Sequence, residues 1–135
     1  MNRIFENSTF SFDFDESRAL CVQHWYGETD ANSYQNDMIT FKELVLKLPR
    51  FDAAIIYPNL SFSISPELQE WTHQNISSAI AGKFIKKCAV IVPKEVFDAL
   101  NIEFLAIEQL VEETPNQSQF KYFTSENDAF EWFKA

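Results

Sequence analysis

A short polar segment, Asn59–Ser65, carries the side chains best suited to hold a ligand. It follows a buried-strand pattern at 51–57, and Ser65-Pro66 is a strong helix start, with a hydroxyl at the N-cap and proline at the first helical position. Free N–H groups at a helix N-terminus favour an anion or a polar ligand. The alternative is structural: Ser65 only caps the helix, and the other side chains solvate a turn. We predict that this loop binds a ligand or a partner, through Tyr57, Asn59, Ser61, Ser63 and Ser65.

The two histidines offer acid–base chemistry, but the sequence gives them no catalytic partners. His24 falls in a predicted strand, and His73 falls on the exposed side of a predicted helix. A histidine can act as acid or base near neutral pH, yet no nucleophile and no metal-ligand pattern accompanies either one. We interpret His24 as a hydrogen-bonded structural residue. A pocket joining His24 to a serine of the Asn59–Ser65 loop would instead indicate a hydrolase or transferase.

The charge balance limits the classes of partner. The chain of 135 residues has 20 Asp and Glu against 11 Lys and Arg, a formal net charge of −9, which argues against nucleic acid or anionic lipid as the main partner. Paired carboxylates occur at positions predicted to be solvated: Glu67/Glu70, Glu112/Glu113 and Asp13/Asp15. We therefore expect no catalytic residues, no metal site and no cofactor, and interpret the protein as a non-enzyme.

The cysteines and the hydropathy pattern indicate a reducing compartment. Cys21 and Cys88 both lie in apolar runs, without a CxxC motif, and are predicted to be small buried hydrophobic residues with free thiols. No run approaches the ~18 apolar residues of a membrane span, and the N-terminal stretch is not typical of a signal peptide. We expect a cytoplasmic protein without membrane insertion.

The elements that must position these residues follow from hydrophobic periodicity. Alternation of polar residues with Phe10, Phe12 and Phe14 predicts a half-buried strand at Thr9–Asp15. Ala19–Tyr26 is its predicted antiparallel partner, with Cys21, Gln23 and Trp25 on the face opposite Leu20, Val22 and His24. The loop between them, 16–18, is polar and turn-like.

Continuous apolar runs at 51–57 and 88–92 predict buried parallel strands, and a last strand is predicted at 119–123. Ile55, Ile56, Val90 and Ile91 are predicted at the centre of the sheet. Helices are predicted at 30–48, 65–82, 95–100 and 101–113 and from 125 onward. We expect one α/β domain spanning residues 1–135, with a mixed five-stranded sheet that begins as an antiparallel hairpin and continues with parallel strands.

Three stretches resemble a known family: ISPELQEW at 64–71, AIAGKFIKKCAVIVPKEVF at 79–97 and FKYFTSENDAFEWF at 120–133. They resemble small SpoIIAA-like proteins of the STAS superfamily. The resemblance implies a mixed five-stranded sheet backed by helices, acting as a protein-interaction or small-ligand-sensing module. In anti-sigma factor antagonists of that family, a partner kinase phosphorylates a serine in a D-S-S-G type sequence. The corresponding segment here, Tyr57–Pro66, has serines but lacks that aspartate and glycine.

The predicted helix at 101–113 is apolar over more than one side. One apolar stripe of this helix includes Ile102 and Leu105. A second strip, on another side of the helix, consists of Phe104, Ile107 and Val111. A core-facing stripe spans little more than 100° of a helix. Either the helix is wedged between two layers, or the second strip contacts a partner, such as a second copy of the chain in a homodimer.

Two functions are compatible with these observations. The first is a non-enzymatic STAS-like interaction or regulatory domain that acts through contacts with a protein partner. The second is a carrier or sensor of a small apolar or amphipathic ligand, because the chain contains 14 Phe and aromatic side chains often line ligand cavities. Phe is also an ordinary core filler, so composition alone does not separate the two.

Overall fold

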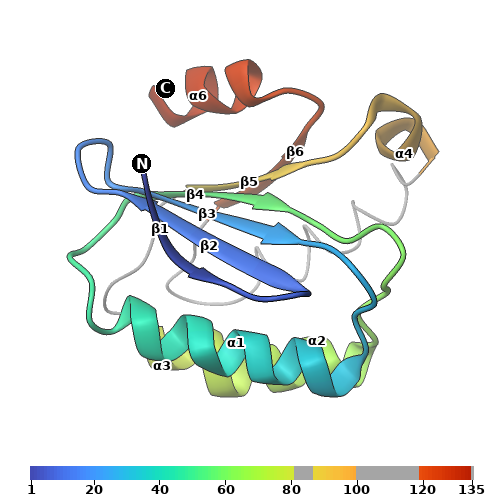
Figure 1. Ribbon diagram of the computed structural model, residues 1–135. Coiled ribbons are helices and arrows are strands. Elements are labelled where there is room, and N and C mark those ends of the chain that lie inside the picture. The colour runs from blue at the N-terminus through green and yellow to red at the C-terminus, as the bar shows by residue number, and fades with distance from the viewer. Residues whose placement is uncertain (81–86, 100–118, 135) are drawn as a thin grey trace.

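Six strands form one mixed sheet, in which strands adjacent in the chain are also adjacent in the sheet (Figure 1). The computed structural model describes residues 1–80, 87–99 and 119–134. The strands are β1 (Asn2–Glu6), β2 (Phe10–Asp15), β3 (Leu20–Trp25), β4 (Ala53–Tyr57), β5 (Lys87–Ile91) and β6 (Gln119–Phe123). β1, β2 and β3 pair antiparallel, and β3, β4, β5 and β6 pair parallel. The predicted change from an antiparallel hairpin to parallel strands is confirmed.

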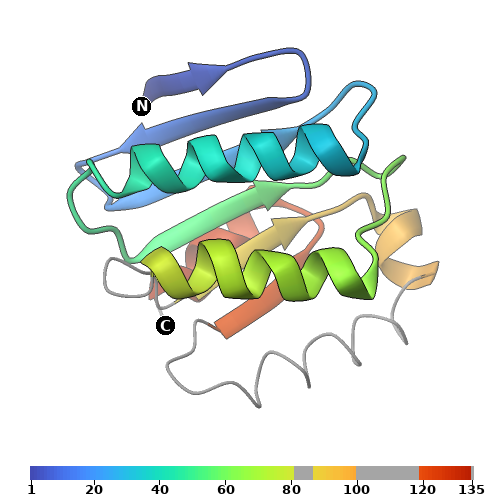
Figure 2. The same ribbon diagram turned by 90° about the horizontal axis from the view of Figure 1, so that it is seen from below.

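Helices cover both faces of the sheet. They are α1 (Ala31–Val45), α2 (Pro66–Thr72), a π-helical turn η1 (His73–Ser77), α3 (Ser78–Ile80), α4 (Lys94–Ala99) and α6 (Glu126–Lys134). α1 and the continuous α2–η1–α3 segment run side by side over one face, here called the helical face (Figures 1 and 2). α6 lies over the opposite face, here called the α6 face. Among the described helices, none is long and apolar enough to cross a membrane.

The sheet has six strands and not the predicted five, because β1 has no sequence pattern typical of a strand. Its residues do not alternate, and its register against β2 shifts between Arg3 and Phe5. The prediction that Asp13 is solvated is wrong, because a residue of β1 covers it and pairs with it. Arg3 Nε donates a hydrogen bond to Asp13 Oδ1 at 2.6 Å, and Asp13 is only 8% exposed. An edge strand with a charged residue pointing across its neighbour is a common protection against edge-to-edge pairing.

Side-chain caps begin three helices at the predicted residues. The Asp30 side chain accepts a hydrogen bond from a first-turn N–H of α1 at 2.8 Å. Ser65 Oγ accepts from Leu68 N at 3.2 Å at the start of α2, and Pro66 follows at the first helical position. Ser125 Oγ accepts from Asp128 N at 3.3 Å before α6. These bonds satisfy N–H groups that have no partner within the helix.

Apolar side chains form one core on each face of the sheet. On the helical face, Phe10, Phe12 and Phe14 from β2 pack with residues of α1 and α2–η1–α3, as their alternation predicts. On the α6 face, Leu20, Val22, Ala53 and Ile55 are buried, with Phe130 and Phe133 of α6 packed against them. Of the four residues predicted at the sheet centre, Ile55 and Val90 are buried and Ile56 and Ile91 are partly buried.

The π-helical turn η1 changes which residues of the second helical segment face inward. Leu68, Ile76 and Ile80 are buried as predicted, and Trp71 is partly buried and packs against the core. The predicted inward residue Ala79, which follows η1, is exposed. A π-turn inserts an extra residue into the helical repeat. Positions after it are therefore rotated relative to the regular helical spacing from which the stripe was predicted.

Three predictions concern residues outside the described part of the chain. They are the end of the second long helix near residue 82, the apolar helix at 101–113 with its strip of Phe104, Ile107 and Val111, and the solvated pair Glu112/Glu113.

A buried carboxylate ties the β1–β2 turn to α1. Asp37 is 4% exposed, and it accepts hydrogen bonds from Asn7 Nδ2 at 2.7 Å and from Thr9 Oγ1 at 2.5 Å. Asn7 Oδ1 in turn accepts from the backbone N–H groups of Thr9 and Phe10, each at 2.8 Å. The turn and the first helix are thus held by a connected polar network.

We predict that Asp37→Ala lowers the free energy of unfolding by about 1.5–3 kcal/mol, because hydrogen bonds to a charged acceptor are lost. Chemical denaturation monitored by circular dichroism measures this. Asn36→Ala is the matched control: it gives the same gain in helix propensity at an exposed neighbouring position and should change stability by less than about 1 kcal/mol. Equal effects of the two variants would contradict the network's role.

Candidate functional site

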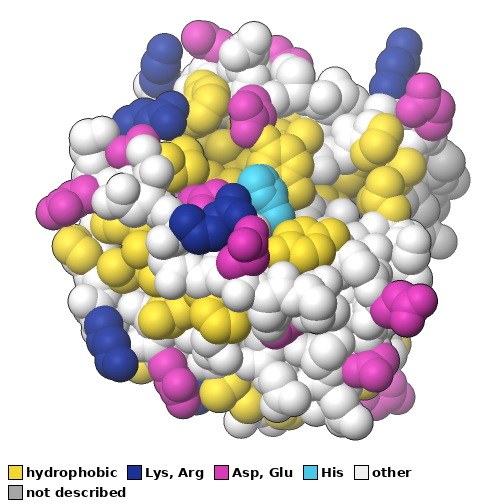
Figure 3. Space-filling model, viewed as in Figure 1, with side chains coloured by type: hydrophobic (Ala, Val, Ile, Leu, Met, Phe, Trp, Pro, Cys, Tyr) yellow, Lys and Arg dark blue, Asp and Glu magenta, His cyan; other side chains and the backbone are white. Residues whose placement is uncertain are grey.

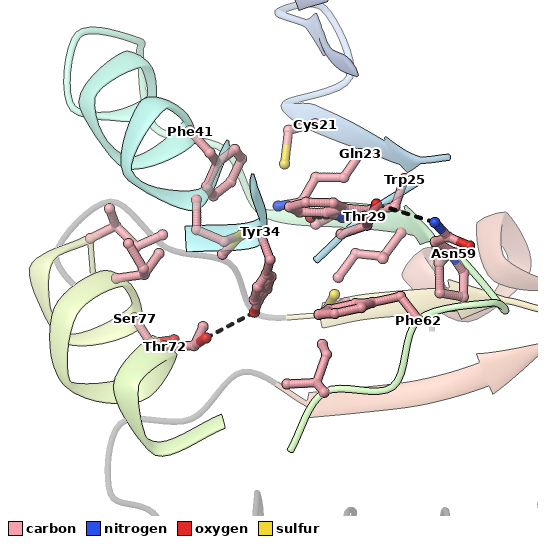
Figure 4. A pocket seen from close by; sticks show the side chains of 18 residues that line it. Cys21, Gln23, Trp25, Thr29, Tyr34, Phe41, Asn59, Phe62, Thr72 and Ser77 are labelled. Atoms are coloured by element: carbon pink, nitrogen blue, oxygen red, sulfur yellow. Dashed lines mark hydrogen bonds between the residues drawn. The ribbon is translucent and has the colours of Figure 1, made fainter. Parts of the chain in front are cut away.

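A pocket of about 260 Å³ lies on the helical face, between the sheet, α1 and the α2–η1–α3 segment (Figure 4). The segment after β4 contributes to its wall through Pro58, Asn59, Phe62 and Ile64. The other lining residues come from β3 to β5, from α1 with Thr29 before it, and from the α2–η1–α3 segment: Cys21, Gln23, Trp25, Thr29, Tyr34, Met38, Phe41, Ala54, Ile56, Thr72, Ile76, Ser77, Ile80 and Cys88. None of these side chains carries a formal charge at neutral pH.

Small side chains on three adjacent strands form the floor of the pocket. The parallel register pairs Cys21 with Ala54 and Ala54 with Cys88, so that the three residues lie in one row across β3, β4 and β5. Residues paired in this way point to the same face of the sheet. Because none of the three side chains is large, the row leaves space between the sheet and the helices.

Aromatic side chains form much of the wall. The ring centroids of Trp25 and Tyr34 are 5.3 Å apart, and those of Tyr34 and Phe62 are 5.8 Å apart, all in tilted arrangements. Phe10 packs against Trp25, and their ring centroids are 4.4 Å apart. Such contacts fix the ring positions, so this wall is formed before any ligand enters.

Apart from Ser77, the hydroxyl groups of the described pocket residues are hydrogen-bonded within the protein. Thr72 Oγ1 donates to Leu68 O at 2.8 Å and lies 2.8 Å from the Tyr34 hydroxyl (Figure 4). Because the single Thr72 proton goes to Leu68, Tyr34 must donate to Thr72 Oγ1. Burial raises the pKa of Tyr34. The phenol is therefore protonated at physiological pH.

Cys21 and Cys88 are buried and free, as predicted. Burial raises the pKa of both thiols, and for Cys21 the neighbouring Cys88 adds to the rise. With Ala54 between them, the two residues are separated by two strand spacings, about 9–10 Å, which exceeds the Cα separation that a disulfide can bridge. The thiols act as apolar floor groups and are poor nucleophiles.

The predicted loop residues do not share one surface. Asn59 lines the pocket, where its Nδ2 donates to Gly27 O at 3.0 Å and to Thr29 Oγ1 at 3.2 Å. Ser61 and Ser63 are exposed, and Ser65 caps α2. Tyr57 lies on the α6 face, because it follows the pocket residue Ile56 by one position in β4.

A second group of polar residues surrounds His24 on the α6 face. The His24 and Tyr57 rings have centroids 4.5 Å apart, and the Tyr57 hydroxyl donates to Glu126 Oε1. Burial and the hydrogen bond to Glu126 raise the pKa of Tyr57. In the space-filling view, a histidine lies in a hollow among hydrophobic side chains, beside basic and acidic side chains (Figure 3). The sheet separates His24 from the pocket, so the pocket does not join it to a serine of the loop.

No group of three or more His, Cys, Asp or Glu residues within the described ranges is arranged to hold a metal ion. Comparison of the chain with protein-family models, with curated proteins and with solved structures finds no match. The resemblance to SpoIIAA-like STAS proteins therefore stays a prediction.

The position of His24 predicts a pH dependence of stability. Burial lowers its pKa below 6.5; the nearby Arg3 also lowers it, while Asp13 and Glu126 oppose the shift. Below pH 6.5 the unfolded chain then binds more protons at this site than the folded chain, so acidification favours unfolding. We predict that the free energy of unfolding of His24→Gln falls less between pH 7.5 and 5.5 than that of the wild type.

Denaturant titrations at several pH values test this. His73→Gln, at an exposed position of η1, is the matched control and should keep the wild-type slope. If His24→Gln and His73→Gln have equal slopes, His24 does not carry the effect.

Proposed function

We propose that this chain is a non-enzymatic domain that binds a small apolar or amphipathic molecule in the pocket on the helical face. The observation that carries the proposal is an apolar cavity of about 260 Å³ with an aromatic wall, in which none of the described lining side chains is charged. Ligand pockets are typically concave, mainly apolar and lined by aromatic residues with a few polar groups. This pocket has each of these features.

The volume sets the size of the ligand. In another protein, an engineered apolar cavity of about 150 Å³ binds benzene. A cavity of about 260 Å³ therefore accommodates a molecule of about ten non-hydrogen atoms. This size corresponds to a substituted single ring or a small bicyclic compound. The groups that could transfer a proton to such a molecule, two buried thiols and a hydrogen-bonded phenol, are held protonated, which supports binding without chemical conversion.

A second candidate function is contact with a protein partner. Leu60 and Ile64 are 54% and 41% exposed, and both belong to the segment that borders the pocket. Exposed apolar side chains favour a contact surface. The strip predicted earlier for this role, Phe104, Ile107 and Val111, lies outside the described residues.

The ligand-binding proposal predicts that ethylbenzene binds the intact chain with a Kd in the submillimolar range, as expected for a ligand of this size. Isothermal titration calorimetry measures the Kd, and native mass spectrometry of gently purified protein shows whether a ligand is retained from the cell. Ala54→Leu adds three carbon atoms to the pocket floor and should weaken ethylbenzene binding at least tenfold. Ala31→Leu, the same substitution at an exposed helix position, should leave it unchanged.

Thermal unfolding verifies that the variants are folded. If Ala54→Leu does not fold, Ile56→Phe fills the same pocket from its edge and replaces it in the test. The proposal fails if the wild-type chain does not bind ethylbenzene, or if Ala54→Leu binds as tightly as Ala31→Leu.

The partner-contact function makes a separate prediction. If Leu60 and Ile64 form a self-association surface, sedimentation at micromolar concentration should show an oligomer that the double variant Leu60→Ser, Ile64→Ser converts to monomer. A wild-type chain that sediments as a monomer would count against self-association through these residues. Ile39→Ser is the control. It changes an exposed apolar residue elsewhere on the surface, on α1, and should leave the oligomer intact.

A further inference from the structure

Gln23 is the one buried amide side chain in the described part of the chain. It lies in the middle of β3, is 6% exposed and lines the pocket. Its Oε1 accepts a hydrogen bond from Trp25 Nε1 at 3.0 Å. An indole N–H can only donate, so this bond fixes the orientation of the amide. The Gln23 oxygen faces Trp25, and the NH₂ group takes no part in this hydrogen bond.

The Gln23 NH₂ group faces the pocket. None of the hydrogen bonds formed by the described residues uses Gln23 Nε2 as a donor. Yet no side-chain nitrogen or oxygen in that part of the chain is both fully enclosed and without a partner. Nε2 must therefore keep accessible surface, and the space next to the Gln23 side chain is the pocket.

The other polar groups of the wall are already paired. Tyr34 donates to Thr72, and Thr72 donates to the backbone. Thr29 Oγ1 donates to Tyr26 O at 3.2 Å, and the Asn59 amide donates to Gly27 O. Among the nitrogen and oxygen side-chain donors of the described lining residues, Gln23 Nε2 and the hydroxyl of Ser77, which is in an exposed position, are still available for a ligand.

We propose that the pocket selects a neutral aromatic molecule with a hydrogen-bond acceptor, such as a carbonyl oxygen, which Gln23 Nε2 binds while Trp25, Tyr34 and Phe62 surround the ring. The proposal rests on the ligand-binding function above and adds the class of ligand. A buried polar donor favours a ligand that pairs with it over one that leaves it unpaired. A charged ligand is disfavoured, because none of the described lining side chains has a charge that would compensate the loss of its hydration.

The test compares two probes of similar shape, acetophenone and ethylbenzene, by isothermal titration calorimetry on the intact chain. The wild type and Gln23→Met are each titrated with both probes, so that differences in probe solubility cancel in the ratio of Kd values. We expect the preference for acetophenone over ethylbenzene to fall about threefold to tenfold in Gln23→Met. Gln74→Met makes the same substitution at an exposed position of η1 outside the pocket, and it should keep the wild-type ratio.

The outcomes separate this inference from the function on which it rests. If neither probe binds the wild type, the ligand-binding function is wrong. If both bind and the ratio is the same in Gln23→Met, the role of Gln23 is wrong but the pocket function stands. Binding of benzoate more tightly than acetophenone would also overturn the choice of a neutral ligand.

A measurement on the wild type keeps the inference testable if Gln23→Met does not fold. Acetophenone should shift the Gln23 side-chain NH₂ resonances in nitrogen–proton correlation spectra, and ethylbenzene should shift them less. Equal shifts with the two probes would contradict a hydrogen bond from Gln23 Nε2.

Discussion

The two-residue alternation of β3 is the constraint on which the rest of the arrangement depends. β3 is antiparallel to β2 and parallel to β4, so it joins the two halves of the sheet. Successive side chains of a strand point to opposite faces. Gln23 and Trp25 therefore enter the pocket, while Val22 and His24 face α6. A register shift of one residue would exchange the two sets and remove both the pocket donor and the α6 core.

The pocket and the stability of the fold make opposing demands on the same residues. A sealed, dry cavity of about 260 Å³ would cost on the order of 5 kcal/mol, and partial access of solvent reduces that cost. Larger side chains in the row of Cys21, Ala54 and Cys88 would fill the space without changing the strand pairing. Phe10 packs against Trp25, with 4.4 Å between the ring centroids, and so restricts how far the Trp25 ring can turn into the space. A ligand that fills the pocket restores the missing contacts, so binding and stability are linked.

Local patterns predicted most of the fold, because strands, caps and buried thiols are encoded by near neighbours in the sequence. The alternation of Phe10 and Phe12 gave the correct face of β2, and Ser65 gave the start of α2. The sequence did not predict β1, because an edge strand with a register shift shows no regular alternation of apolar and polar residues. The exposure of Ala79 was missed because a π-turn cannot be inferred from helical spacing.

The candidate site was only partly predictable, for a physical reason. The sequence predicts a site in the loop after β4, and one residue of that loop predicted to bind, Asn59, lines the pocket. The floor, however, exists only because Cys21, Ala54 and Cys88 come into register across three strands. No local pattern contains that register.

The alternation of side chains along the strands also separates the polar groups of the pocket from those around His24. It therefore limits the chemistry that is possible in the pocket. Ile56 and Tyr57 are adjacent in β4 but lie on opposite faces of the sheet. The acid–base groups around His24 therefore cannot reach a molecule held against Gln23. Such a molecule meets an aromatic wall, protonated thiols and one amide donor. These groups can select and hold a ligand, but none is placed to take up or release a proton at neutral pH, which is why binding is the function that this geometry favours.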